Sequence, residues 1–264
     1  MSKRLLHAGQ VSDDIKAPIS MHSRAVKADL DKFFMALPTN LQQHSKSQRN
    51  IPNLSYFSMY SSTDYLTIVA IARRYYHSAE VFIYESSLHR SLFPMSLNSQ
   101  RLDMLYACLT SAKALLDDIL VLPSSSYYSM SHMTLAQVGH VLATAFKLCF
   151  VDVPGWDLAH VRSTVNILRY FDHLISQFRH VGALIDNSQQ PPGKRSFPTG
   201  CALALGRVRG WYENRVAAEK EATQQEEQTG PTGMEDTFMG ENFDYFDEAF
   251  MGDWQTFAGD FMQQ

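Results

Sequence analysis

Six long segments of this chain carry apolar residues at helical spacing, and this pattern constrains the fold more than any other feature. The segments cover roughly residues 20–37, 64–88, 98–122, 134–150, 158–185 and 201–222, and polar loops or prolines separate them. The chain shows no convincing run of short alternating strands. Because isolated helices are marginal in water, their apolar faces must pack together. The sequence therefore predicts an all-α fold, a multi-helix bundle over residues 20–222.

Local signals add detail to this prediction. The segment 64–88 is apolar nearly all round, so we expect a buried helix there. The Ser/Tyr-rich stretch after Pro123 is expected to be a loop, and the segment 158–185 to be one continuous helix. Pro154 and Gly155 break the chain, and Asp157 is placed to cap the helix that follows.

Composition distinguishes three segments outside the predicted helical bundle. Residues 1–19 are predicted to be a loose lead-in, and residues 223–234 a flexible linker because of their Gln, Glu, Thr and Gly content. Eight of the chain's 27 acidic residues lie in residues 235–264, which contain no Lys or Arg. Residues 1–234 then hold 19 acids against 23 bases. An acidic tail on a slightly basic body is typical of an interaction segment attached to a folded domain.

The tail also carries an aromatic stripe. On a helix its members would fall within an arc of about 80°, at spacings of three and four residues; they are Phe243, Phe246, Phe250, Trp254, Phe257 and Phe261. Three glycines in the tail each cost about 1 kcal/mol of helix propensity. The tail is therefore predicted to be disordered alone and to form an amphipathic helix on an apolar groove of a partner. The alternative is that it packs on its own body as a seventh helix.

Catalytic and metal-binding patterns are missing from the sequence. The histidine pairs His132/His140 and His173/His180 lack the spacing that places two ligands on one ion, and HExxH is absent. Adjacent acids at 117 and 118 diverge on a helix and do not converge on one substrate atom. No GxSxG, GxGxxG or P-loop occurs. We predict no catalytic residue, no metal site and no cofactor, hence no enzyme.

Other partner classes are also disfavoured. Arg207, Arg209, Arg215 and Lys220 form a basic run, but three glutamates interrupt it, so a solvated helix face is favoured over nucleic-acid binding. No run of 18 apolar residues or signal peptide is present, so no membrane contact is expected. The three widely spaced cysteines, among them Cys108 within an apolar helix, are predicted to be buried or free thiols.

The central region resembles the helical regulatory region, or middle homology region, of fungal zinc-cluster transcription factors. The resemblance covers roughly residues 25–185 and is carried by DLDKFFMALP, Cys108-Leu109, Ala112, Ala114 to Asp117, Lys147-Leu148, Pro154 to Asp157 and Val161-Arg162. It implies an all-α regulatory domain, a nuclear protein and a role in transcription. That family carries a six-cysteine zinc cluster, which three cysteines cannot form.

The resemblance and the tail together define the expected partners. We expect no direct DNA binding from this chain, a separate DNA-binding partner protein, and a coactivator that the tail recruits. The chain would then be the regulatory and activation portion of a fungal transcriptional regulator. The alternative is a non-enzymatic all-α scaffold or effector-binding module whose tail packs on its own body.

Overall fold

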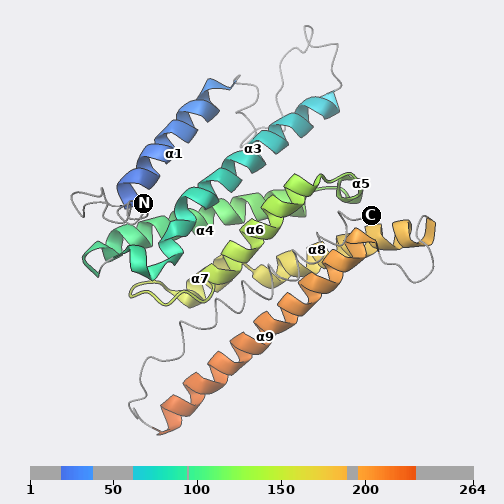
Figure 1. The fold of residues 1–264 in the computed structure, drawn as a ribbon. Coiled ribbons are helices and arrows are strands. Elements are labelled where there is room, and N and C mark those ends of the chain that lie inside the picture. Colours follow the sequence, from blue (N-terminus) through green and yellow to red (C-terminus); the bar gives the residue numbers. More distant parts are fainter. Residues whose placement is uncertain (1–18, 38–61, 94, 189–195, 230–264) are drawn as a thin grey trace, which may run out of the picture. The chain divides into compact units, whose positions relative to one another are not determined.

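The described part of the molecule is built from helices alone (Figure 1). A computed structural model describes residues 19–37, 62–93, 95–188 and 196–229, and these ranges contain no strand. The all-α prediction is therefore confirmed. Contacts divide the chain into two compact units, Met1–Cys108 and Leu109–Gln264, and the division falls inside a helix.

The first unit contains an antiparallel helix pair. Its elements are α1 (Ile19–Ala36), α3 (Ser62–Tyr84), the short 3-10 helices η1 (Glu85–Leu88), η2 (Arg90–Leu92) and η3 (Met95–Leu97), and the start of α4 (Asn98–Leu120). Ser23 on α1 reaches the carbonyl of Ile83 near the end of α3, whereas Phe34 packs against Tyr76 about two turns earlier in α3. The two helices thus run side by side in opposite directions.

The turns between α3 and α4 are fixed by a buried arginine. The Nε of Arg101 donates to the carbonyl of Ser87 over 2.8 Å, and its guanidinium also donates to the carbonyl of Leu88 over 3.3 Å. Burial, followed by the nearby charge of Arg90, lowers the pKa of Arg101. The two carbonyls that a broken helix would leave unpaired are satisfied in this way.

The sequence pattern predicted a more completely buried α3 than the structure shows. Val69 and Val81 are buried, as expected for an apolar helix. Ile71, Tyr75 and Phe82 are exposed, so one face of α3 lies on the surface of the protein. Apolar residues all round a helix indicate burial only where neighbours cover every face, and α3 has such neighbours on part of its circumference.

The second unit is organised around α8. It contains the rest of α4, then α5 (Ser124–Tyr128), α6 (His132–Leu148), α7 (Leu158–Thr164), α8 (Ile167–Ser188) and α9 (Phe197–Thr229). Helix α8 contacts α5, α6 and, over the largest area, α9. Its inward side chains recur at intervals of three and four residues and are buried, namely Phe171, Leu174, Phe178 and Val181.

Two stretches differ from the sequence predictions. The Ser/Tyr-rich stretch expected to be a loop forms the short helix α5, because the hydroxyl of the buried Tyr127 is anchored to the carbonyl of Ile119 over 2.8 Å. The segment expected to be one helix is split into α7 and α8. Val165 is extended there, and Asn166 caps α8 by accepting from the backbone of Arg169. Two helices with separate caps replace one.

The last helix is longer than predicted. Helix α9 begins at Phe197 and ends at Thr229, so residues 223–229, expected to belong to the linker, are helical. Gln and Glu are good helix formers, and their polarity alone did not indicate an end. The limits of a regulatory domain at residues 20 and 222 stay a prediction. Within the described residues, none of the helices is both long and apolar enough to span a bilayer.

Candidate functional site

The predicted partner-binding residues cannot be placed in the structure. Phe243, Phe246, Phe250, Trp254, Phe257 and Phe261 all lie outside the described residues, as do residues 1–18 of the predicted lead-in and residues 230–234 of the predicted linker. Their helical stripe stays a prediction. The features that the structure does describe are a polar cluster in the first unit and a buried corner with its supporting helices in the second.

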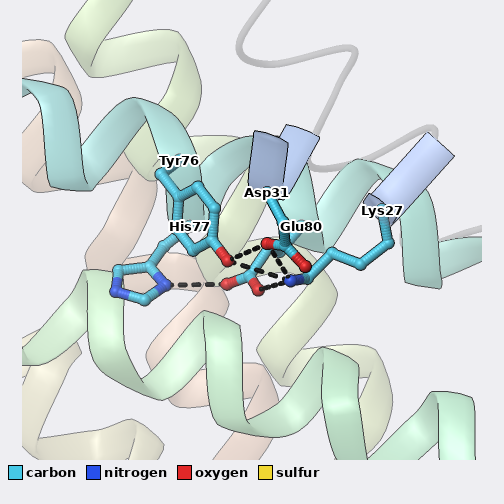
Figure 2. Close-up of polar contacts among 5 residues, drawn as sticks. All are labelled: Lys27, Asp31, Tyr76, His77 and Glu80. Carbon is cyan, nitrogen blue, oxygen red and sulfur yellow. Dashed lines mark hydrogen bonds and ion pairs between the residues drawn. The ribbon is translucent and has the colours of Figure 1, made fainter. Parts of the chain in front are cut away.

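Five residues form the polar cluster between α1 and α3 (Figure 2). The Nζ of Lys27 lies 2.5 Å from Asp31, 2.9 Å from the hydroxyl of Tyr76 and 3.2 Å from Glu80. The Tyr76 hydroxyl donates to Asp31 over 2.6 Å, and Glu80 lies 2.8 Å from the Nδ1 of His77. Glu80 is only 8% exposed, so its charge is buried and requires these partners.

The ionisation of the cluster follows from these contacts. Burial alone would lower the pKa of Lys27, but its hydrogen bonds to Asp31, Tyr76 and Glu80 outweigh burial and raise it. The hydrogen bond from Lys27, and then that from Tyr76, lowers the pKa of Asp31. Burial, and then the hydrogen bond to Asp31, raises the pKa of Tyr76 to about 12. The lysine and Asp31 are thus held charged and pair with one another. This geometry locks α1 onto α3.

In the second unit the Pro-Gly-Trp-Asp corner connects α6 to α7. Gly155 has a φ of 88°, a left-handed conformation that glycine adopts without strain. The Nε1 of buried Trp156 donates to the carbonyl of Leu148 over 3.1 Å, at the end of α6. Asp157 caps α7 by accepting from the backbone N–H of His160 over 3.0 Å, as the sequence predicted. Gly155, Trp156 and Asp157 thus each have an identifiable structural task.

Arg162 connects this corner to α9. Its Nε donates to the carbonyl of Cys149 over 2.9 Å, and its guanidinium lies over the ring of Phe150 at 4.9 Å. The same guanidinium forms an ion pair with Glu219 on α9 at 2.5 Å. Glu219 also lies 3.5 Å from Arg215. The arginine of the resemblance motif therefore holds the helix that precedes the tail.

Hydrogen bonds join the end of α8 to the start of α9 in their hairpin. Asp186 accepts from the backbone N–H of Ser196 and from the hydroxyl of Thr199, both over 2.8 Å. These hydrogen bonds lower the pKa of Asp186, with that from Thr199 the larger cause. Gly182 faces the same threonine, and a Cβ added there would lie 2.3 Å from its hydroxyl. No spacing or motif in the sequence indicated this contact.

The acid, histidine and cysteine side chains considered as catalytic or metal-binding candidates make structural contacts or are buried. Asp117 accepts from Tyr170 over 2.7 Å and pairs with Lys113, and His173 lies 2.9 Å from the hydroxyl of Tyr127. All three cysteines are free and buried, as predicted, and burial raises the pKa of each thiol; that of Cys149 and that of Cys201 rise to about 12. In the part of the chain that the structure describes, no three His, Cys, Asp or Glu side chains form a group that could hold a metal ion.

Half of the basic run on α9 is paired with acids. Arg209 pairs with Asp172 on α8 at 2.6 Å and with Glu213 at 2.7 Å. Two of its four bases, Arg209 and Arg215, are thus committed to carboxylates. This arrangement favours a solvated, internally paired helix face over a phosphate-binding surface.

Comparison with known proteins supports the resemblance. A family model named ATEG07667_C and described as a C-terminal domain matches residues 124–263, from α5 to the end of the tail. The protein named Transcription factor opdL, from Penicillium oxalicum, is 37% identical over 106 residues, which are 40% of this chain and 19% of the relative. The aligned region thus spans about a fifth of that relative's length. No solved structure matches the chain.

Proposed function

Because the chain belongs to the ATEG07667_C family of C-terminal domains, we propose that it is the regulatory and activation portion of a fungal transcriptional regulator acting in the nucleus. The similarity to a protein named as a fungal transcription factor is the observation that carries this proposal. The helical body agrees with the regulatory regions that the central segment resembles. No catalytic role is assigned to any residue.

The tail is the part that recruits a partner. Its eight acids keep the six aromatic rings soluble, and the rings provide the binding energy once they enter an apolar groove. The family match extends through residue 263, so the tail belongs to the region that the family shares. The partner is a coactivator domain with an apolar groove and a basic rim. A separate DNA-binding protein positions the chain at its genes.

The helical body supports the tail through α9. That helix ends at Thr229, within the linker predicted between the body and the tail, and the ion pair between Arg162 and Glu219 ties it to the corner after α6. The body thereby anchors the tail at a defined helix end. The neutralised bases of α9 are consistent with a body that contacts proteins and leaves DNA to its partner.

A tethering experiment tests the proposal with the full chain. Residues 1–264 are fused to an unrelated DNA-binding domain, and reporter output is compared with a variant carrying Phe246→Ala, Phe250→Ala and Trp254→Ala. We expect activation by the parent fusion and a loss of at least tenfold in the variant. The matched control removes three large side chains off the predicted stripe, with Tyr245→Ala, Met251→Ala and Met262→Ala, and keeps most of the activity.

Two outcomes would contradict the proposal. A fusion that is made, folded and nuclear but inactive would favour the alternative of a scaffold or effector-binding module. Equal losses in the stripe variant and in the control would show that composition alone acts, without a helical binding face. Imaging of the tagged chain in a fungal cell tests the nuclear location directly, and exclusion from the nucleus would contradict it.

A further inference from the structure

The buried residues of helix α1 are polar. They are Ser20, which donates to the side chain of Gln100 on α4, and Ser23, which donates to the carbonyl of Ile83 on α3. Helix α3 is the main neighbour of α1. A surface helix is normally held to its neighbours by a buried apolar face. The contact between α1 and α3 therefore differs in kind from the packing of an ordinary amphipathic helix.

The apolar side chains of α1 bury little surface. None of them is fully buried, and four are more than half exposed, namely Met21, Val26, Phe33 and Met35. Phe34 is half-buried, and its ring centroid lies 4.4 Å from that of Tyr76. Because the free energy of docking scales with the apolar area that is removed from water, separating α1 from α3 costs less than separating two core helices.

Lys27 supplies the strongest contacts between the two helices. Its Nζ lies 2.9 Å from the hydroxyl of Tyr76 and 3.2 Å from Glu80, and it also lies 5.2 Å from the centre of the Tyr76 ring. Glu80 is buried while α1 is docked, and a buried carboxylate is costly without a cationic partner. His77, which also contacts Glu80, belongs to α3 and stays with it. The docked position of α1 thus depends on Lys27.

We propose that α1 is a releasable strap, which leaves α3 as a unit while the other described helices stay folded. The latch of this strap is the contact of Lys27 with Glu80 and Tyr76. A single helix of 18 residues is marginal in water, so the released strap also loses its own backbone hydrogen bonds. Release gives water access to the carboxylate of Glu80 and the hydroxyl of Tyr76. The strap thereby covers and uncovers a polar face of α3.

Native-state hydrogen exchange of the full chain tests the release. The amides of α1 should exchange on the order of a hundredfold faster than those of α8, because opening the strap exposes little buried surface. For the same reason the exchange rate of α1 should depend only weakly on urea, whereas that of α8 should rise steeply. If α1 and α8 exchanged at the same rate and with the same dependence on urea, α1 would open only in global unfolding. That result would overturn the proposal.

Lys27→Met tests the latch. It leaves Glu80 buried without its lysine, so exchange in α1 should accelerate on the order of tenfold or more while α8 is unchanged. Lys32→Met is the matched control, because it makes the same substitution on the same helix and helix propensity barely changes. Lys32 is 78% exposed and pairs with Asp29 inside α1. Equal acceleration by Lys27→Met and Lys32→Met would overturn the latch.

Two further variants keep the test independent of any general loss of stability. Tyr76→Phe removes the hydroxyl but keeps the ring, so it should accelerate exchange in α1 less than Lys27→Met does. Adding Glu80→Gln to Lys27→Met should slow exchange in α1 again, because the buried charge is removed together with its partner. Acceleration of α8 to the same degree as α1 in these variants would show that α1 belongs to the global folding unit, and would contradict a separate strap.

Discussion

At the scale of single residues, Trp156 has the most clearly defined structural role. Its indole N–H is the donor for a backbone carbonyl at the end of α6, where the helix no longer supplies one. The residue therefore combines an apolar body with one specific hydrogen bond. The Pro-Gly-Trp-Asp motif, which carried part of the resemblance, is explained in the structure by a buried hydrogen-bond donor, a left-handed glycine and a helix cap.

Replacing this donor should destabilise the protein. Trp156→Phe keeps an aromatic ring but leaves the carbonyl of Leu148 buried without its partner, at a cost of about 1–3 kcal/mol. Urea unfolding followed by circular dichroism measures the change in the free energy of unfolding. Wild-type stability in this variant would mean that the indole hydrogen bond does not hold the corner.

The pairing of Asp31 makes stability depend on pH in a defined direction. The pKa of Asp31 in the folded protein lies below the ordinary value of 3.8. The pairing therefore stabilises the folded protein fully above pH 3.8, and this stabilisation is lost as the pH falls through the lower folded pKa. The difference in unfolding midpoint between the parent and Asp31→Asn should be constant between pH 5 and 7 and shrink below pH 3.8. A difference that grows on acidification would contradict the assignment.

At the scale of elements, the glycines of the α8–α9 hairpin allow two effects of a glycine-to-alanine substitution to be measured separately: overpacking and backbone entropy. Gly182 is needed for contact, because a Cβ there would press on the hydroxyl and backbone of Thr199. Gly182→Ala should therefore cost about 1–3 kcal/mol through overpacking. Thermal unfolding of this variant checks the sign, and an increase in stability would show that the hairpin can open at no cost.

Gly206 and Gly210 lie in the same hairpin without that constraint. Both are inside helix α9, and a Cβ at either position meets nothing within 4 Å. Gly206→Ala and Gly210→Ala should each stabilise the protein by about 0.4–1 kcal/mol, because alanine loses less backbone entropy in a helix. Destabilisation by either substitution in the same thermal assay would indicate that α9 is not a continuous helix there.

Elements with strong periodicity could be predicted from sequence, and those set by tertiary contacts could not. The six apolar segments and the Asp157 cap are present in the structure, with one segment divided. Helix α5 depends on the long-range anchoring of Tyr127, which local spacing does not reveal. The packing of α1 depends on the cluster around Lys27, and of its periodic apolar residues Phe34 stacks on Tyr76 whereas Val26 and Phe33 are exposed.

The functional assignment shows the same division. Periodicity predicted the helices and composition predicted an interaction tail, but no short motif identified the polar cluster or the close contact at Gly182. Both join residues that are separated in the sequence. The cluster does so through ion pairs, and Gly182 does so through close packing on Thr199. The tail residues lie outside the described ranges, so their role rests on spacing and charge, together with the family match that reaches residue 263.

At the scale of the whole molecule, the account assigns separate tasks to the parts of the chain. The second unit carries the corner and the hairpin that lead into the tail, and it contains the whole of the family match. The first unit carries the polar cluster that joins α1 to α3.

The central claim is that the tail alone recruits the transcription machinery. Residues 230–264 fused to an unrelated DNA-binding domain test it most directly, in a reporter assay beside the Phe246→Ala, Phe250→Ala, Trp254→Ala variant. The account predicts strong activation by the parent segment and its loss in the variant. An inactive parent segment that is expressed and nuclear would contradict the account and favour a tail that packs on its own helical body.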